Sequence, residues 1–74
     1  LPSRVPGCRW ARFDDVVPDG APVRYLRLLG LPGWADVCST GRRWLAVVDV
    51  PVSRVRDFST KREAMRWVER QVTT

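Results

Sequence analysis

The chain has 74 residues, a formal net charge of +5 and 45% hydrophobic residues, four of them tryptophan. A chain of this length and apolar content forms one domain with a small core, which excludes intrinsic disorder as its native state. No apolar run approaches the roughly 18 residues of a membrane-spanning helix, and the first residues lack the features of a signal peptide, so we expect a cytoplasmic protein without a membrane segment.

Arginine supplies nearly all of the positive charge, since Lys61 is the only lysine. Arginine pairs in a bidentate manner with phosphate and with guanine edges, which favours a nucleic-acid ligand. The chain also lacks isoleucine and asparagine and is rich in alanine, glycine, proline and valine. This composition is typical of a GC-rich genome, in which arginine replaces lysine without a functional reason. We therefore use only the net charge, which bears on solubility and non-specific binding.

Residues that ligate metals are scarce. The chain has no histidine, and Cys8 and Cys38 do not form a Cys-x-x-Cys pair. A structural zinc site takes about four nitrogen or sulfur ligands, so the sequence predicts neither a metal site nor a cofactor. A disulfide between the two cysteines is an open alternative, although in a cytoplasmic protein we expect two small apolar side chains.

The first part of the chain is predicted to be irregular and then extended. Residues 1–8 contain two prolines and a glycine and predict an irregular leader. Residues 9–17 are ambiguous, because Trp10, Phe13 and Val17 would share one face of a short helix. A turn signal at 18–20 instead makes this segment the first arm of a hairpin, which is the alternative that we favour.

Three further segments, 23–29, 34–38 and 43–50, have the composition of strands. Short glycine-containing connections separate them, which predicts an antiparallel meander. Residues 52–57 would form a connection or a short edge strand after the third of these segments.

Both faces of this sheet would carry apolar side chains. In the third strand Trp44, Ala46 and Val48 alternate with Leu45 and Val47, and in the first strand Leu26 and Leu28 alternate with Tyr25 and Leu29. A sheet with one solvated face should instead alternate between apolar and polar residues. Either residues 10–17 cover the second face, or that face binds another molecule. We expect self-coverage, because large exposed apolar patches are rare on monomers.

The run from Phe58 to Glu69 predicts a capped amphipathic helix that begins at Ser59 or Thr60. Thr60 and Glu63 fit a capping box, and Phe58 should pack back on the helix. The apolar face would carry Ala64, Met65, Val68 and Val72, with Trp67 on its flank, and the outer face would carry Arg62, Glu63, Arg66, Glu69 and Arg70. Ion pairs are expected between Glu63 and Arg66 and between Arg66 and Glu69.

These elements predict an α+β fold in a single domain that spans residues 9–74. A three-stranded antiparallel meander, or a four-stranded one if an uncertain segment joins it, packs against one C-terminal helix. Catalysis has little support, because the chain offers no histidine as a base and the adjacent Asp14 and Asp15 would diverge in a helix or a strand. We therefore expect a binding protein that is not an enzyme.

DNA binding is the function that the sequence favours. Arg42 and Arg43 lie at a predicted hairpin turn, where two cations could meet a phosphate backbone. The other candidate contacts lie on the neighbouring strand and on the last connection: Arg24, Arg27, Arg54 and Arg56. Strands can enter the major groove of DNA. The ring of Trp44, next to the turn, is expected in the core.

The run Phe58-x-Thr60-Lys61-x-Glu63-Ala64-x-x-Trp67, following a meander, resembles the end of the arm-type (AP2-like) DNA-binding domain of tyrosine-recombinase integrases of phages and mobile elements. The resemblance implies a three-stranded antiparallel sheet backed by a C-terminal helix, with the sheet in the major groove. The chain departs from the family pattern at Leu45 and Val47, where polar side chains would be needed to read bases, and in its scarcity of lysine.

A protein that binds another protein is the alternative. A small phage or accessory protein would bind a protein partner, or form a homodimer, through an apolar sheet face or edge. The residues at the centre of such a patch would be Trp34, Leu45 and Val47.

Overall fold

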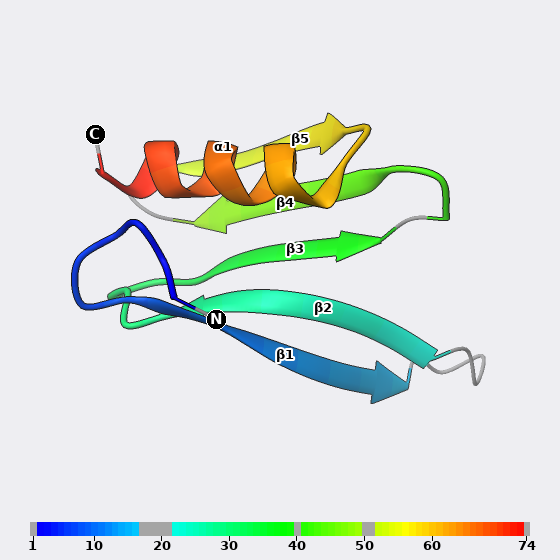
Figure 1. Ribbon diagram of the computed structural model, residues 1–74, viewed down its shortest axis with the longest axis horizontal. Coiled ribbons are helices and arrows are strands. Elements are labelled where there is room, and N and C mark those ends of the chain that lie inside the picture. The colour runs from blue at the N-terminus through cyan, green and yellow to red at the C-terminus, as the bar shows by residue number, and fades with distance from the viewer. Residues whose placement is uncertain (1, 17–21, 40, 50–51, 74) are drawn as a thin grey trace.

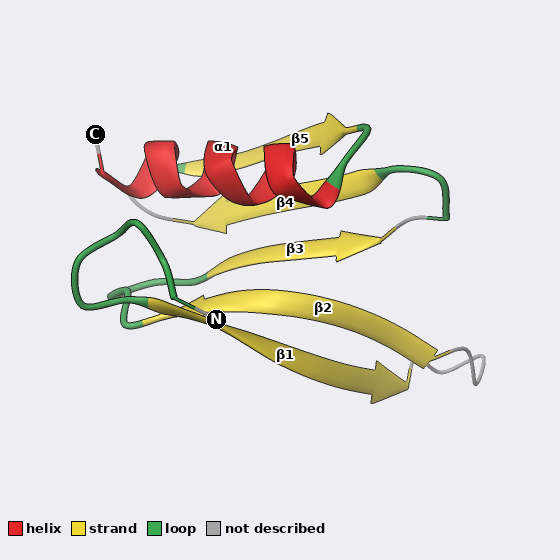
Figure 2. Ribbon diagram, viewed as in Figure 1, coloured by secondary structure: helices red, strands yellow, loops and turns green. Residues whose placement is uncertain are grey.

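Five strands and one helix make up the fold, and neighbours in the chain are neighbours in the sheet (Figures 1 and 2). The computed structural model describes residues 2–16, 22–39, 41–49 and 52–73. The elements are β1 (Arg9–Val16), β2 (Pro22–Leu29), β3 (Ala35–Ser39), β4 (Trp44–Asp49), β5 (Ser53–Phe58) and α1 (Lys61–Thr73). Each strand pairs antiparallel with the next, which gives a meander.

The predicted α+β architecture is confirmed, but the sheet has five strands where three or four were expected. Both uncertain segments are strands. Residues 9–16 pair with β2 over their whole length, from Arg9 opposite Leu29 onward. Residues 53–58 pair with β4, yet every side chain before Phe58 is exposed, so this strand lacks the apolar alternation that identifies a strand in a sequence. The predicted turn at 18–20 lies outside the described residues.

The helix begins where the capping signal predicts. The Glu63 amide donates to Thr60 Oγ1 at 3.2 Å, which satisfies one of the amides that the first turn leaves without a helical partner. Phe58 packs back as expected, with its ring centroid 5.8 Å from that of Trp67. The helix then lies over β3, β4 and β5 (Figure 1).

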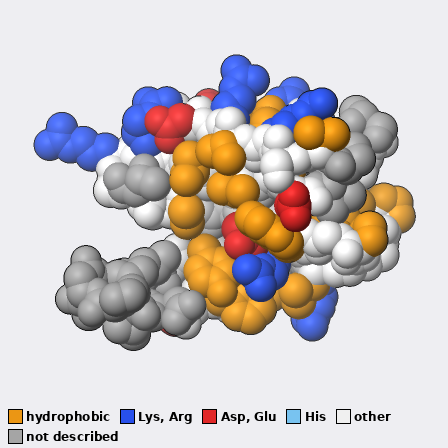
Figure 3. Space-filling model, turned by 180° about the vertical axis from the view of Figure 1, so that it is seen from behind, with side chains coloured by type: hydrophobic (Ala, Val, Ile, Leu, Met, Phe, Trp, Pro, Cys, Tyr) orange, Lys and Arg blue, Asp and Glu red, His pale blue; other side chains and the backbone are white. Residues whose placement is uncertain are grey.

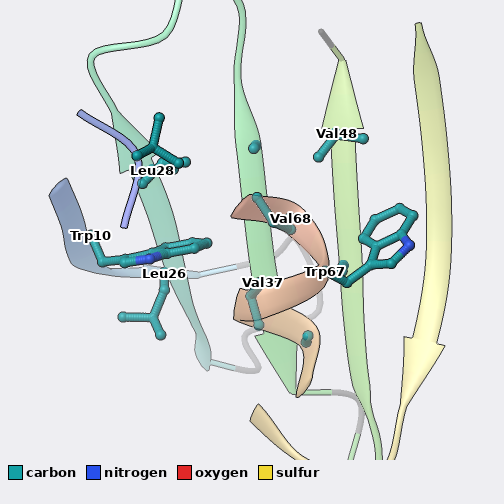
Figure 4. Packing of buried hydrophobic residues seen from close by; sticks show 11 residues of the cluster. Trp10, Leu26, Leu28, Val37, Val48, Trp67 and Val68 are labelled. Carbon is teal, nitrogen blue, oxygen red and sulfur yellow. The ribbon is translucent and has the colours of Figure 1, made fainter. Parts of the chain in front are cut away.

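The core lies between the helix and one face of the sheet, which we call the helix side. Its buried hydrophobic residues are Val5, Trp10, Leu26, Leu28, Ala35, Val37, Ala46, Val48, Ala64, Trp67 and Val68. Figure 4 shows Trp10 beside Leu26 and Leu28, with Val68 and Val37 between this group and Trp67. Tryptophans from β1 and α1 therefore fill the two ends of one layer. The predicted alternation within β2 and β4 is confirmed, because Ala46 and Val48 are buried while Leu45 and Val47 are half-buried on the opposite face.

The expectation that residues 10–17 cover the second face is wrong. These residues up to Val16 form an edge strand, so alternation turns Trp10 into the core and Phe13 to the opposite face. Among the residues that the structure describes, no helix or strand lies over that second face, which we call the open face.

Glu69 occupies a position that the sequence did not predict. Instead of pairing with Arg66 on the outer face, its carboxylate is buried and accepts hydrogen bonds from Ser3 Oγ at 2.8 Å, the Arg4 amide at 2.8 Å and Trp10 Nε1 at 3.3 Å. Burial alone would raise the pKa of Glu69, but these donors and the charge of Arg4 outweigh it and lower the pKa. The carboxylate thus ties the irregular N-terminal segment to the helix.

The turn after β2 is built close to the same N-terminal segment. Gly30 has a φ of +104°, and a Cβ added there would lie 2.6 Å from the carbonyl oxygen of Gly7. Only glycine fits without a shift of backbone. Nearby Cys8 and distant Cys38 are both free and half-buried, so the disulfide alternative is not formed.

Candidate binding surfaces

The helix side carries a large group of cations around the buried core, which we call the basic surface. Its members are Arg12, Arg24, Arg54, Arg56, Lys61, Arg62, Arg66 and Arg70. The strand members are assigned by register, because Arg12 is opposite Leu26 and Arg56 is opposite Ala46, whose side chains are buried on this side. Arg62, Arg66 and Arg70 follow at four-residue spacing along the exposed stripe of α1.

The arginines predicted to bind DNA are divided among three places. Arg24, Arg54 and Arg56 lie on the helix side, Arg27 lies on the open face, and Arg42 and Arg43 lie between β3 and β4. The structure therefore brings half of the set to one face and does not join all six. The half on the helix side is joined by Arg12, Lys61 and the helix arginines, which the predicted set omitted.

The predicted arginines of the helix side make only exposed contacts within the chain. Arg24 Nε lies 3.5 Å from Asp14 Oδ1, with both side chains mostly exposed. Arg54 donates an exposed hydrogen bond to Gln71 of α1, and the Arg56 guanidinium lies 5.5 Å from the ring centroid of Phe58. Exposed contacts of this kind contribute about 0–1 kcal/mol, so a phosphate can replace them at small cost.

On the open face, in contrast, Arg27 and Arg43 are held in short ion pairs. Arg27 makes a bidentate pair with Asp36, its cross-strand neighbour, with Nε–Oδ1 at 2.8 Å and Nη2–Oδ2 at 3.0 Å. The hydrogen bond to Asp36 raises the pKa of Arg27 further above its already high value. At the rim of the same face Arg43 Nε lies 2.7 Å from Asp57 Oδ2. These two cations are neutralised by carboxylates of the chain.

Two aromatic rings extend the Arg27 pair across three strands. Phe13 and Tyr25, which are cross-strand neighbours, stack with centroids 5.5 Å apart and planes 16° apart. The guanidinium of Arg27 lies 5.8 Å from the first centroid and 5.4 Å from the second. We call Phe13, Tyr25, Arg27 and Asp36 the open-face cluster. This cluster was not predicted from the sequence, because Phe13 is expected there in the segment that covers the second face of the sheet.

Apolar side chains continue from the open-face cluster to the far edge of the sheet. Leu29, Leu45 and Val47 are half-buried, and Val55 on the edge strand is 63% exposed. Figure 3, which views the molecule from behind, shows hydrophobic side chains gathered across the middle of this face. Of the predicted partner-binding residues, Leu45 and Val47 lie on this face, and Trp34 precedes β3 with 42% of its surface exposed.

Comparisons with protein-family models, with curated proteins and with solved structures found no match to this chain. Within the described ranges no three cysteine or acidic side chains come together in a way that could hold a metal ion. In the same part of the chain no helix combines the length and apolar character needed to cross a membrane.

Proposed function

We propose that this chain is a non-catalytic module that binds DNA, and that its basic surface on the helix side contacts the phosphate backbone. The observation that carries the proposal is the separation of charge between the two faces of the sheet. On the helix side Arg24, Arg54 and Arg56 are exposed and make weak contacts, such as the 3.5 Å pair of Arg24 with Asp14, whereas Arg27 and Arg43 on the other side are held by carboxylates at 2.8 and 2.7 Å.

Phosphate binding depends on cations that are exposed and only weakly held by the chain. Each arginine or lysine that meets a phosphate releases a condensed counterion, which makes affinity fall steeply with salt. A pI of about 10.6 for the chain and the clustering of its cations on one face are the electrostatic pattern expected of a nucleic-acid-binding protein. The acids on that side are few, and one of them, Glu69, is buried among its own donors.

The test is an electrophoretic shift with a DNA duplex in a salt series from about 50 to 200 mM. Wild type should bind at the low end, with an affinity that falls steeply as salt rises. The variant Arg56→Ala/Arg62→Ala should bind more weakly and reduce the slope of log affinity against log salt by about 2, one for each lost contact. No binding by wild type at low salt overturns the proposal.

The matched control removes the same charge from the other places in the fold. Arg9 is exposed on β1 with its side chain on the open face, and Arg42 is exposed between β3 and β4. Arg9→Ala/Arg42→Ala should leave the affinity within about twofold of wild type, because neither residue belongs to the basic surface. If this variant lost as much DNA affinity as Arg56→Ala/Arg62→Ala, the DNA interface would instead include the hairpin turn between β3 and β4.

A second candidate function is self-association through the open face, and the open-face cluster favours it. Phe13 is 36% exposed in a stacked pair with Tyr25, and the guanidinium of Arg27, which Asp36 neutralises, lies near both rings. The paired charges of both signs can meet a second copy without net repulsion, because the basic surface is on the opposite side.

Sedimentation over a concentration series tests this second candidate. Wild type should sediment as a dimer at high concentration, and Val55→Glu should dissociate it, because a carboxylate in an apolar interface is costly. Arg62→Glu, a charge change on the helix side, should leave the dimer intact. If the wild type is monomeric at every concentration, self-association is contradicted. A different protein would then be the partner to seek for the open face.

A further inference from the structure

A groove on the helix side has the composition of a nucleotide site. It lies beside the start of α1, above the part of the sheet that the helix leaves uncovered, and has a volume of about 300 Å³. That volume is at the lower end of the range for sites that take small molecules. The side chains that give the groove its chemistry are Arg12, Arg24, Leu26, Val37, Trp44 and Lys61.

The cations of the groove come from three separate elements. Arg12 is on β1, Arg24 is on β2, and Lys61 is the first residue of α1. Their convergence places positive charge on more than one wall, and among the described residues that line the groove there is no carboxylate. Asp14 is near Arg24, but at 3.5 Å with both groups exposed it is a weak partner. The groove therefore favours an anion, and arginine in particular favours phosphate.

The floor of the groove is apolar, which a simple phosphate site does not need. Leu26 and Val37 are buried members of the sheet, and the half-buried ring of Trp44 forms part of the wall. The ammonium of Lys61 lies 5.9 Å from the centroid of that ring, so the positive charge and the aromatic surface adjoin. A ligand that satisfies both parts has a flat apolar portion and a phosphate a few ångströms away. A nucleotide has this chemistry.

We infer that the groove takes one unstacked nucleotide of a single-stranded DNA, with the base against Trp44 and Leu26 and the neighbouring phosphates on Arg12, Arg24 and Lys61. The inference rests on the proposed function and specifies that the DNA is single-stranded. In a duplex the bases are stacked inside, so only phosphates can reach the groove. A single strand can offer both groups, and aromatic side chains bind its bases with little dependence on sequence.

The experiment compares fluorescently labelled oligo(dT) with a duplex of equal length, using anisotropy at one salt concentration. Wild type should bind oligo(dT) more tightly than the duplex. Trp44→Leu should weaken oligo(dT) binding about fivefold or more, the loss expected for one base–aromatic contact, and leave duplex binding within about twofold. Circular dichroism and thermal melting show whether this variant is folded.

A second pair of variants keeps the inference testable if the Trp44 variant does not fold. Arg12 and Arg9 are exposed arginines of the same strand whose side chains lie on opposite faces of the sheet. Arg12→Ala should weaken oligo(dT) binding severalfold and lower its salt slope by about 0.7, whereas Arg9→Ala should change neither. Wild-type binding that is equal for the two DNA forms, or equal losses from Arg12→Ala and Arg9→Ala, overturns the inference and leaves DNA binding standing. If the protein binds neither DNA form, both this inference and the proposed function are overturned.

Discussion

On the helix side of the sheet, the core side chains are buried, and the arginines around them are exposed and make weak contacts. On the open face, the apolar side chains are half-buried or exposed, and Arg27 and Arg43 are held by neighbouring carboxylates. Both faces use the same strands, and neighbouring residues such as Val47 and Val48 belong to different environments. The buried core of the helix side holds the fold together, whereas the open face leaves apolar side chains accessible beside short ion pairs.

The largest expected effect comes from comparing a buried tryptophan with an exposed one. Trp10 is 2% exposed in the core, and Trp34 is 42% exposed before β3. Trp10→Ala should lower the free energy of unfolding by about 3–5 kcal/mol, because it leaves a cavity and removes one donor to Glu69. Trp34→Ala, the same chemical change, should cost about 1 kcal/mol or less. Urea unfolding followed by circular dichroism measures both.

A chain of this size has few kcal/mol to lose, so Trp10→Ala is expected to be largely unfolded at 37 °C. Trp10→Phe supplies a measurable intermediate, because it retains a ring but loses the indole donor. If Trp34→Ala destabilised the chain as much as Trp10→Ala does, the open face and its surroundings would belong to the core, and the comparison of the two faces would be wrong.

The parts of the fold that carry regular patterns could be predicted from the sequence. The helix start at Thr60 and the alternation within β4 depend on local spacing, and both are confirmed. For β5 the sequence left a connection and a short edge strand open, because its exposed residues show no apolar alternation, and pairing with β4 makes it a strand. Residues 9–16 could either cover the sheet or join it as a strand. Their pairing with β2 makes them an edge strand.

The candidate surfaces were harder to predict than the elements. The predicted arginines were grouped by closeness in the sheet, but the face of each one depends on register, which divides Arg24 from Arg27 although both are on β2. Glu69 illustrates the same limit on the helix. Its angular position is close to Met65 and Val72, at the border of the apolar face, and only the N-terminal segment supplies the donors that make burial there favourable.

The second effect, of about 1–3 kcal/mol, is expected at Glu69 on the helix side. Its pKa is lowered in the folded chain, so the stability that it contributes is fully present above the ordinary glutamate value of about 4.3 and is lost as the pH falls through the folded-state pKa. Glu69→Gln should lower the free energy of unfolding at neutral pH by about 1–3 kcal/mol, since hydrogen bonds to a charged acceptor become hydrogen bonds to a neutral one.

The measurement for Glu69 is the urea midpoint from about pH 7 down to about pH 3. Wild type should lose stability on the acid side, and Glu69→Gln should flatten this part of the profile. Ser3→Ala removes one donor and keeps the carboxylate, so it should fall between the two. An acid profile of Glu69→Gln identical to that of wild type would show that the carboxylate does not hold the N-terminal segment in place.

The smallest effect is expected on the open face, at the Arg27–Asp36 pair. The side chains are 39% and 19% exposed, so solvent screens the pair in part, and a double-mutant cycle with Arg27→Ala and Asp36→Ala should give a coupling energy of about 0.5–1 kcal/mol. A double-mutant cycle on the more exposed pair of Arg43 and Asp57 should give a smaller coupling energy.

The dependence of the coupling energy on protein concentration is a further test of the comparison between the two faces. If the open face is buried by self-association, the Arg27–Asp36 coupling should grow as the dimer forms, because the pair then lies away from water, where charges interact more strongly. A coupling energy that is the same in dilute and in concentrated protein, in a sample that sedimentation shows to be dimeric, would place the dimer contact somewhere other than the open-face cluster.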